Sequence, residues 1–380
     1  MIRTIAIFSN PFGYGPTGNA IPILRSLFRK IKDIDIIFVG SNLCLEIISD
    51  TLVKKVVLDE RNQEEIEKFL GTLDNPHVIG SQNRFCIKAA KKLQIPCAFL
   101  DVLAWFWEKI PPDHLLADEI FWINFPGIKN KIPPNQNNIH IVSGIISSLP
   151  RKKSKKNHAM MHIGGAKYPL SESLPYAYLD LIAKGLNALK KGKRFDAIIF
   201  TGGSQAINYL KHKVTNKKVR LASLVEEKFI QELSQSSHML TTAGVSSTFE
   251  SFSLNIPTSF LLPLNLSQIA LLDILFKNDC APNYLIWDNY VKVNNNLRSM
   301  TEKDALAEIN EYAKIVAGNK RLSNRFSRDF DDLTTLIPES SKQVKLIESI
   351  GNSGADEVVD ILIKKWELPE TIYSKNIKDR

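Results

Sequence analysis

A turn of small residues followed by hydroxyl side chains carries the clearest chemistry in this sequence. A short apolar run ends in a turn at Gly244, and a helical pattern opens with Ser246, Ser247 and Thr248 in its first turn. Free backbone N–H groups at a helix N-terminus, joined by short hydroxyls, favour a bound phosphate. Glu250 lies in the next turn, where its carboxylate could accept hydrogen bonds from both hydroxyls of a ribose. The spacing therefore indicates a site for a nucleoside diphosphate.

A second polar loop follows the next predicted strand, residues 258–262. That strand ends at Pro263, and the helix behind it carries Asn265 and Gln268 about one turn apart. Because open α/β sheets bind ligands at the carboxyl ends of their strands, this loop is expected to face the same crevice. A glycine-serine turn or a solvated glutamate arises easily by chance, so the ordered set of both loops is what favours a ligand site.

Together these residues resemble the donor-binding signature of GT-B glycosyltransferases, especially the bacterial N-acetylglucosaminyltransferase that makes lipid II and the UDP-glycosyltransferases. The resemblance implies that the helix after Gly244 binds the diphosphate of a UDP-sugar and that Glu250 binds its ribose. It further implies that Asn265 and Gln268 bind the donor sugar. It covers the fold plan of most of the chain, although only the second half matches in its motifs.

Two further loops of the second half carry roles that only this resemblance implies. Gly164 and Gly165 follow a predicted strand and would lie beside the diphosphate. Ser223 also follows a strand, at the position where the family contacts uracil through backbone groups. The run 202–205, Gly-Gly-Ser-Gln, has the composition of a motif in the lipid II enzyme but falls one strand-helix unit later, so no role is assigned to it.

The loop after the first strand, residues 10–20, contains three glycines within six residues, which lets a ligand approach the backbone closely. It is not a dinucleotide-binding fingerprint, because Pro16 interrupts the spacing, and a tight strand-to-helix turn would explain the glycines equally well. The resemblance implies that this loop lies at the cleft and contacts acceptor or donor. The cleft residues expected there are Asn10, Gly13, Tyr14, Gly15 and Thr17. Many family members carry a catalytic His or Asp in this loop, and this chain has neither between Ser9 and Ala20.

Asp101 ends the predicted strand 97–100 and is therefore expected at the crevice. It is our candidate for the general base that takes a proton from the acceptor. Capping of the following turn is the competing interpretation, since Asp performs that role very commonly. Weaker candidates for the base follow at Glu108, Asp113 and His114.

An aromatic run after Asp101 offers a surface for an acceptor. Trp105 and Trp107 could stack on an aromatic or sugar acceptor, or dip into a membrane surface. A place in the hydrophobic core would explain the same residues. The basic run 151–156 could likewise attract an acidic lipid or a diphosphate, or simply keep a linker solvated.

Strands and helices alternate strictly along the chain, which predicts an α/β protein with two Rossmann-like, doubly wound parallel sheets. With the GT-B resemblance, these sheets belong to two domains that face each other across a cleft. The expected division is an acceptor domain at 1–147, a basic linker at 148–157, a nucleotide-sugar-binding domain at 158–345, and a C-terminal helix and polar tail at 346–380. The amphipathic stretch 356–366 is expected to cross back to the first domain. Shorter elements are predicted as helices at 21–31 and 43–52 and a strand at 284–287.

The composition indicates the partners and the location of the protein, but not its reaction. The chain has 380 residues and a formal net charge of +9, which favours anionic partners without choosing among them. Its four cysteines lack the paired spacing of a metal site, so we expect a reduced protein without structural zinc. No cofactor is expected, because a UDP-sugar would be a substrate. No signal peptide precedes the first strand and no run reaches the length of a membrane span, so a cytoplasmic location is expected.

The leading hypothesis is a glycosyltransferase that moves a sugar from a UDP-sugar to a small-molecule or lipid-linked acceptor. No DxD-like pair lies between strands at the cleft, which favours a metal-independent reaction in which cationic and N–H groups stabilise the leaving UDP. A single base without a nucleophile favours inversion.

Two alternatives stay open. A UDP-N-acetylhexosamine 2-epimerase or hydrolase of the same fold ranks lower, because the cleft candidates are poor in carboxylates and histidine. A non-enzymatic protein that binds polyanions is the other, although nucleic acid is not the expected partner because Lys and Arg are scattered apart from the run 151–156. Neither the donor sugar nor the oligomeric state can be read from the sequence.

Overall fold

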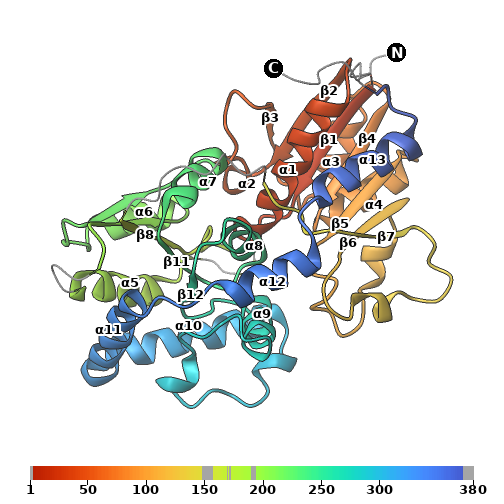
Figure 1. Ribbon diagram of the computed structural model, residues 1–380. Helices are drawn as coiled ribbons and strands as arrows, with labels where there is room; N and C mark the ends of the chain where they lie inside the picture. Colours follow the sequence, from red (N-terminus) through yellow and green to blue (C-terminus); the bar gives the residue numbers. More distant parts are fainter. Residues whose placement is uncertain (1–2, 148–156, 169, 171–172, 190–193, 371–380) are drawn as a thin grey trace.

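The structure, a computed structural model, describes residues 3–147, 157–168, 170, 173–189 and 194–370. It has two halves, each built around one parallel β-sheet with helices on its faces (Figure 1). We call residues 3–147 the first half and residues 157–350 the second half. The predicted α/β architecture with two Rossmann-like sheets is confirmed. All of the predicted basic linker except Asn157 lies outside the described residues.

The first half contains a seven-stranded sheet of order β3-β2-β1-β4-β5-β6-β7. Its strands are β1 (Arg3–Ser9), β2 (Ile34–Gly40), β3 (Lys54–Val57), β4 (Pro76–Ser81), β5 (Cys97–Asp101), β6 (Glu119–Ile123) and β7 (Ile139–Val142). Its helices are α1 (Gly15–Lys30), α2 (Asn42–Leu45), α3 (Gln63–Leu70) and α4 (Arg84–Lys92), with 3₁₀ turns η1 (Pro112–Leu115) and η2 (Ile128–Lys131). The central strands read as apolar runs because both faces are covered by helices. Since β1 pairs with both β2 and β4, the winding direction changes beside β1, and a crevice opens there.

The second half contains a five-stranded sheet of order β10-β9-β8-β11-β12. Its strands are β8 (His158–His162), β9 (Ala197–Thr201), β10 (Val219–Ala222), β11 (His238–Thr241) and β12 (Thr258–Phe260). The helices that alternate with them are α5 (Tyr176–Ala188), α6 (Ser204–Lys211), α7 (Glu226–Gln235), α8 (Val245–Ser253) and α9 (Leu266–Lys277). Here β8 pairs with both β9 and β11, so the corresponding crevice lies beside the end of β8.

Four helices complete the chain, namely α10 (Glu302–Gly318), α11 (Lys320–Thr335), α12 (Ser341–Ile350) and α13 (Gly354–Trp366). Helices α10 and α11 pack on α5, whereas α12 packs on α8. Helix α13 returns to the first half and lies along α1, as Figure 1 shows. There Lys30 pairs with Asp360 at 2.5 Å and Arg29 pairs with Asp356. The predicted boundary at residue 345 falls inside α12.

Several predicted elements differ from the observed ones. Helix α1 begins at Gly15 and not at Ile21, because Pro16 occupies the first turn of a helix, where its missing N–H costs no hydrogen bond. Helix α2 ends at Leu45, well short of the predicted 43–52. The predicted strand 284–287 is reduced to a single bridge between Tyr284 and Phe260, followed by the 3₁₀ turn η3 (Trp287–Asn289). Helix α12 was not predicted at all.

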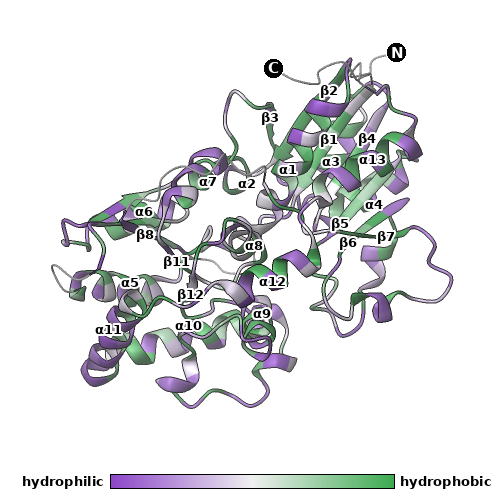
Figure 2. Cartoon of the chain, viewed as in Figure 1, coloured by the Kyte–Doolittle hydropathy of each residue, from purple (hydrophilic) through white to green (hydrophobic). Residues whose placement is uncertain are grey.

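One apolar core fills the first half and continues into α8, α9 and α12 of the second half, and a separate core fills much of the rest of the second half. Figure 2 shows the hydrophobic strands inside and hydrophilic residues on outer helices such as α11. Phe249 of α8 stacks on Phe125 of the first half, with ring centroids 6.3 Å apart. Helix α8 is therefore anchored between the halves, so that its N-terminus is held in a fixed place. Among the described residues, no helix combines the length and the apolar character needed to cross a membrane.

Candidate active site

A cavity of about 140 Å³ lies between the two halves, at the carboxyl ends of both sheets. The first half contributes the loop after β1, the start of α1 and the turn after β5. The second half contributes residues from the loops that follow its strands together with the N-terminal ends of α7, α8 and α9. The lining residues that the chemistry below uses are Gly13, Tyr14, Gly15, Asn19, Ile47, His162, Gly164, Gly165, Tyr168, Leu224, Glu226, Phe229, Gly244, Ser246, Ser247, Glu250, Asn265 and Gln268.

The two halves touch directly across the middle of this cavity. The Gly13 N–H donates to the Lys167 carbonyl at 3.1 Å, and a Cβ atom on Gly165 would lie only 3.0 Å from the Gly13 Cα. Gly13 also has a positive φ of +64°, which a side chain would disfavour. Ser246 donates from its hydroxyl to the Asn19 side-chain oxygen at 3.2 Å. The two halves are thus in direct contact at the cavity, through backbone as well as side chains.

The N-terminus of α8 faces the cavity without a side-chain cap. Gly244 is the N-cap residue and has no side chain with which to cap the first N–H groups of the helix. Ser246 and Ser247 both line the cavity, and Ser247 contacts the Thr241 hydroxyl at 3.2 Å. Thr248, in contrast, is fully buried and does not line the cavity. Uncapped N–H groups beside two hydroxyls form the kind of site that binds a phosphate.

Glu250 lies one turn further along α8 and is nearly buried, with 5% of its surface exposed. Its Oε1 accepts a hydrogen bond from the Ser147 hydroxyl at 3.1 Å. Burial, and then the nearby Glu226 carboxylate, raise the pKa of Glu250 well above its usual value. The closed cavity therefore favours the protonated acid, which keeps capacity to donate and to accept hydrogen bonds.

Asn265 and Gln268 lie together at the start of α9 and both line the cavity. Asn265 caps the helix by accepting the Gln268 N–H at 2.9 Å, and its amide donates to the Tyr168 hydroxyl at 3.2 Å. The Gln268 oxygen accepts the Leu264 N–H at 2.7 Å. These bonds hold both amides in place at the end of the cavity that Tyr168 closes.

Solved structures share this architecture along almost the whole chain. MurG of Acinetobacter baumannii matches with a TM-score of 0.51 at 12% identity, covering 96% of this chain and 100% of its own. UGT89C1 of Arabidopsis thaliana in complex with UDP gives a TM-score of 0.57 at 12% identity, with coverages of 96% and 100%. A Listeria monocytogenes structure assigned as a UDP-N-acetylglucosamine 2-epimerase gives 0.54 at 12% identity, with coverages of 97% and 98%. No protein-family model and no curated protein matches the sequence.

The chain has the GT-B fold. Because the sequence identities are so low, the likeness establishes the fold alone. What individual residues do must come from the geometry of the cavity.

In this GT-B chain, the loop after β1 divides into residues that line the cavity and residues that support it. Gly13, Tyr14 and Gly15 line it, and the Tyr14 hydroxyl donates to Glu46 at 2.6 Å. Asn10 and Thr17 do not line it. The Asn10 amide donates to the Gln82 carbonyl at 3.0 Å, and the Thr17 hydroxyl lies 2.7 Å from that of Ser9.

The predicted glycine pair of the second half, Gly164 and Gly165, lines the cavity after β8. Gly202 of the later glycine pair also lines the cavity, and Gly203 packs against Gly165, since a Cβ atom on Gly203 would lie 2.4 Å from the Gly165 carbonyl oxygen. The two glycine-rich turns thus form one thin wall of backbone. Ser223 is exposed, and its side chain interacts with the Tyr14 hydroxyl outside the cavity lining.

Asp101 is completely buried at the end of β5 and does not line the cavity. One carboxylate oxygen accepts the Leu103 N–H at 3.1 Å, and the other lies 2.8 Å from His114 Nδ1. The residues that follow it, Val102 and Leu103, do line the cavity. Asp101 therefore shapes the wall from behind, and its role as a base stays a prediction.

The two tryptophans predicted near an acceptor also lie outside the cavity lining. Trp105 belongs to the core of the first half, where it stacks on Phe125 with centroids 4.9 Å apart and donates to the Val102 carbonyl. Trp107 is half-buried and meets the His114 ring edge to face at 5.4 Å. Both hold the turn after β5, and a contact with an acceptor stays a prediction.

Sequence reasoning missed two titratable residues that line the cavity, Glu226 and His162. Glu226 begins α7 and pairs with Arg25 of α1 at 2.6 Å, across the two halves. His162 ends β8, and burial lowers its pKa to about 4, so the ring is neutral at pH 7. His162 could have been found, because it stands immediately before the glycine pair. An acidic residue at a helix start is too common to have singled out Glu226.

The expected cationic groups around the diphosphate are not found in the described lining, which contains neither lysine nor arginine. In that part of the chain, backbone N–H groups and hydroxyls have to provide the positive potential. A search of the described residues also finds no group of three or more His, Cys, Asp or Glu side chains that could hold a metal ion.

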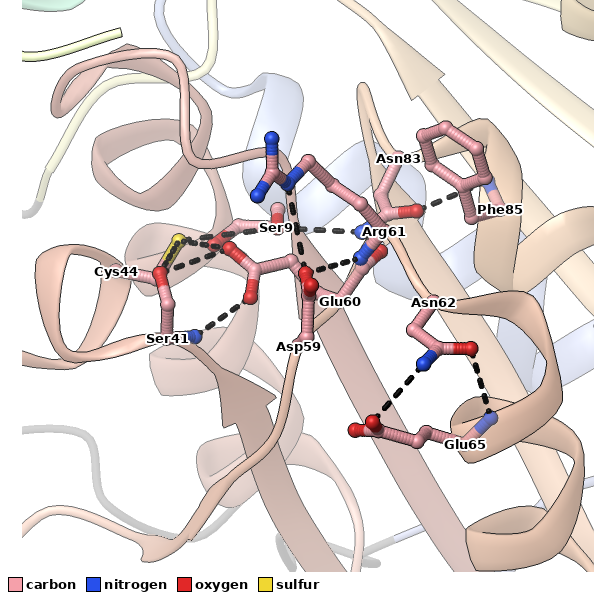
Figure 3. Close-up of polar contacts among 10 residues, drawn as sticks. All are labelled: Ser9, Ser41, Cys44, Asp59, Glu60, Arg61, Asn62, Glu65, Asn83 and Phe85. Atoms are coloured by element: carbon pink, nitrogen blue, oxygen red, sulfur yellow. Dashed lines mark hydrogen bonds and ion pairs between the residues drawn. The ribbon is translucent and has the colours of Figure 1, made fainter. Parts of the chain in front are cut away.

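A second buried polar cluster lies behind the loop after β1 and is shown in Figure 3. Glu60 has no exposed surface and accepts bonds from the Ser41 N–H at 2.7 Å, the Ser41 hydroxyl at 2.9 Å and the Cys44 thiol at 3.2 Å. Asn83 donates to the Ser9 carbonyl at 3.3 Å and to the Glu60 carbonyl at 2.9 Å. Burial and Glu60 raise the pKa of Cys44 to about 12, which leaves an unreactive thiol. The cluster ties the ends of β1, β2 and β4 together and so fixes the floor under the cavity.

Proposed function

We propose that this protein is a glycosyltransferase that binds a UDP-sugar in the cavity between its halves and transfers the sugar to a small-molecule or lipid-linked acceptor. The observation that carries the proposal is the convergence of three features on one cavity. These are the uncapped N-terminus of α8, the buried acid Glu250 one turn beyond it, and the amide pair of Asn265 and Gln268. Such a set offers partners for a diphosphate, a ribose and a sugar.

The arrangement suggests how the leaving group would be stabilised. As the glycosidic bond to the diphosphate breaks, negative charge develops on UDP. The N–H groups at the start of α8 and in the turn at Gly164 and Gly165 are fixed in place and shielded from water, so they can stabilise that charge without rearranging. Metal independence and inversion of the anomeric centre remain parts of this proposal.

For the base, we propose that Asp101 acts together with His114. The carboxylate holds His114 Nδ1 at 2.8 Å, which fixes the ring and leaves its Nε2 as the atom that could take a proton. His114 retains some exposure, whereas Asp101 has none. The acceptor would then approach the turn after β5 when the halves separate.

The first experiment is calorimetric titration of the full chain with UDP, UDP-glucose, UDP-N-acetylglucosamine and UDP-glucuronate. We expect at least one of them to bind and Glu250→Ala to weaken binding by about 1.5–3 kcal/mol, the cost of unpairing a buried polar partner. Glu227→Ala is the matched control, because Glu227 is an exposed glutamate of the same half and should leave affinity unchanged. Binding of polyanions without any nucleotide sugar would instead support the non-enzymatic alternative.

One observation favours the epimerase or hydrolase alternative more than the sequence did. Glu226, Glu250 and His162 all line the cavity, so the site is not poor in carboxylates and histidine as we had predicted. These are groups that could move protons on a sugar ring. Incubation with UDP-N-acetylglucosamine in the absence of any acceptor, followed by NMR, separates the two. A new free or epimerised sugar would replace the transferase proposal, whereas an unchanged donor supports it.

A further inference from the structure

The proposed donor site predicts how a nucleotide is oriented in the cavity. The diphosphate would lie at the start of α8, and the Cα of Glu250, five residues beyond Val245, is roughly 7–8 Å further along the helix axis. The amides of Asn265 and Gln268 line the same cavity on another helix, α9, beside Tyr168. A nucleoside bound with its ribose at Glu250 would have its base within reach of Glu226, which also lines the cavity and whose carboxylate is close enough to raise the pKa of Glu250.

The part of the cavity around Glu226 is built like a pocket for a flat ring. Leu224, Phe229 and Ile47 line it together with Glu226. The only charged groups described here are the two glutamates and Arg25, whose Nη2 lies 2.6 Å from Glu226 Oε2. The backbone N–H of Glu226 donates to the Ile47 carbonyl at 2.8 Å, which holds the start of α7 against the first half. Glu226 is thus a fixed hydrogen-bond acceptor in an apolar setting.

The arginine in this ion pair has unused capacity. Its Nε is buried and has no hydrogen-bond partner among the described residues. Arg25 does not itself line the cavity, so its guanidinium holds the Glu226 carboxylate from behind. Neither the Glu226 carboxylate nor the Arg25 guanidinium is used by the diphosphate, ribose or sugar contacts proposed above.

We propose, resting on the proposed UDP-sugar site, that Glu226 selects the base of the nucleotide by accepting a hydrogen bond from the N3–H of uracil. Arg25 is a positioning residue that holds the carboxylate from behind the cavity lining. Cytosine presents an unprotonated nitrogen at the same position, so its lone pair faces a carboxylate and CDP is rejected. The exposed Ser223 side chain takes no part in this selection.

Calorimetry with the full chain and three ligands tests this. Wild-type protein should bind UDP at least about tenfold more tightly than N3-methyl-UDP or CDP, as expected when a buried polar partner is left unpaired. Glu226→Gln carries an amide that can donate to cytosine N3, so the preference for UDP over CDP should shrink about tenfold or reverse. The matched control, Glu227→Gln one residue along, should keep the wild-type preference.

The ratio of UDP affinity to CDP affinity also tests the role of Arg25. Arg25→Met should lower the ratio of UDP to CDP affinity, whereas Arg29→Met, one turn along α1 and paired with Asp356, should not. A structural role alone would weaken both nucleotides equally.

Two further outcomes would overturn the proposal that Glu226 selects the base. Equal binding of UDP, N3-methyl-UDP and CDP by the wild-type protein overturns the base-selection proposal and leaves the UDP-sugar site standing. Because that comparison needs no variant, it holds even if Glu226→Gln fails to fold. Absence of all nucleotide binding overturns this proposal together with the proposed function.

Discussion

Glu60 in the first half and Glu250 in the second are both buried glutamates, but they differ in how many donors surround them. Glu60 accepts three side-chain or backbone hydrogen bonds, from Ser41 and Cys44. Glu250 accepts one, from Ser147, and lies near a second carboxylate that raises its pKa. The chain supplies nearly all partners of the first acid and few partners of the second.

The same contrast separates the regions around them. Behind the loop after β1, the polar side chains of Ser9, Thr17 and Asn83 bond one another and nearby carbonyls. At the cavity, the N-cap residue Gly244 offers no side-chain cap to the first N–H groups of α8, and behind the lining the Arg25 Nε has no partner among the described residues. A buried polar group that the fold satisfies stabilises the fold, whereas one left with spare capacity indicates where a ligand binds.

Substitution of Asp101 is expected to have the largest effect on turnover. It tests whether a buried acid with partners inside the fold can still be catalytic. Both carboxylate oxygens of Asp101 have partners, as those of Glu60 do, yet we predict a catalytic role for it with His114. Asp101→Asn should lower the turnover rate about 100- to 10,000-fold, the range of general base catalysis, and leave UDP affinity unchanged. Turnover is measured as UDP release with the donor and acceptor that support it. If the rate falls only as much as the amount of folded protein falls, Asp101 has a structural role like that of Glu60.

Glu60→Ala tests the structural side of the comparison. The substitution leaves the Ser41 N–H, the Ser41 hydroxyl and the Cys44 thiol without their acceptor inside the protein. We expect the unfolding free energy of the first half to fall by about 3 kcal/mol or more, measured by urea denaturation. Glu64→Ala, at an exposed glutamate four residues away, is the control and should change little. Near-wild-type stability would mean that buried water replaces the carboxylate.

The pH dependence of folding stability tests the role of Glu250, the buried acid with few partners inside the fold. Its pKa is raised in the folded protein, so the folded state binds its proton more tightly than the unfolded state does. Its contribution is fully present below the usual glutamate pKa and is lost as pH rises toward the raised value. Ligand-free wild-type protein should therefore lose stability over that rise relative to Glu250→Gln, in thermal melts at matched pH. Parallel curves for the two proteins would show that Glu250 is solvated in the ligand-free state.

The sequence predicted the helix starts of α8 and α9 well, because local patterns encode them. A small-residue turn, a run of hydroxyls and a helix start determine the N-terminus of α8, and they need no distant contact to be recognised. The same holds for Asn265, which caps α9 and thereby places Gln268. Strict alternation of strands and helices likewise predicted both sheets.

The sequence could not predict which half-buried polar residues meet across the cleft. Arg25 and Glu226 are 201 positions apart, and each looks like an ordinary residue of an amphipathic helix. Asp101 was expected at the crevice from its position after β5, but its side chain turns to His114, which follows in an irregular segment. Side-chain direction after a strand depends on such tertiary partners, and periodicity carries no information about them.

Substitution of Gln268 is expected to have the smallest effect, because this residue combines a hydrogen bond within the fold with a position on the cavity wall. Its oxygen accepts the Leu264 N–H, which is a structural bond, while the residue also lines the cavity where the donor sugar would lie. Gln268→Ala should weaken a bound UDP-sugar by about fivefold and leave UDP itself unchanged, because one neutral hydrogen bond contributes about 1 kcal/mol. The ratio of the two affinities, measured by calorimetry, removes any general effect on the loop, and Asn278→Ala at the exposed end of α9 is the control. If UDP and the UDP-sugar weaken equally, Gln268 only supports the loop, and the sugar must be bound by other groups of the cavity.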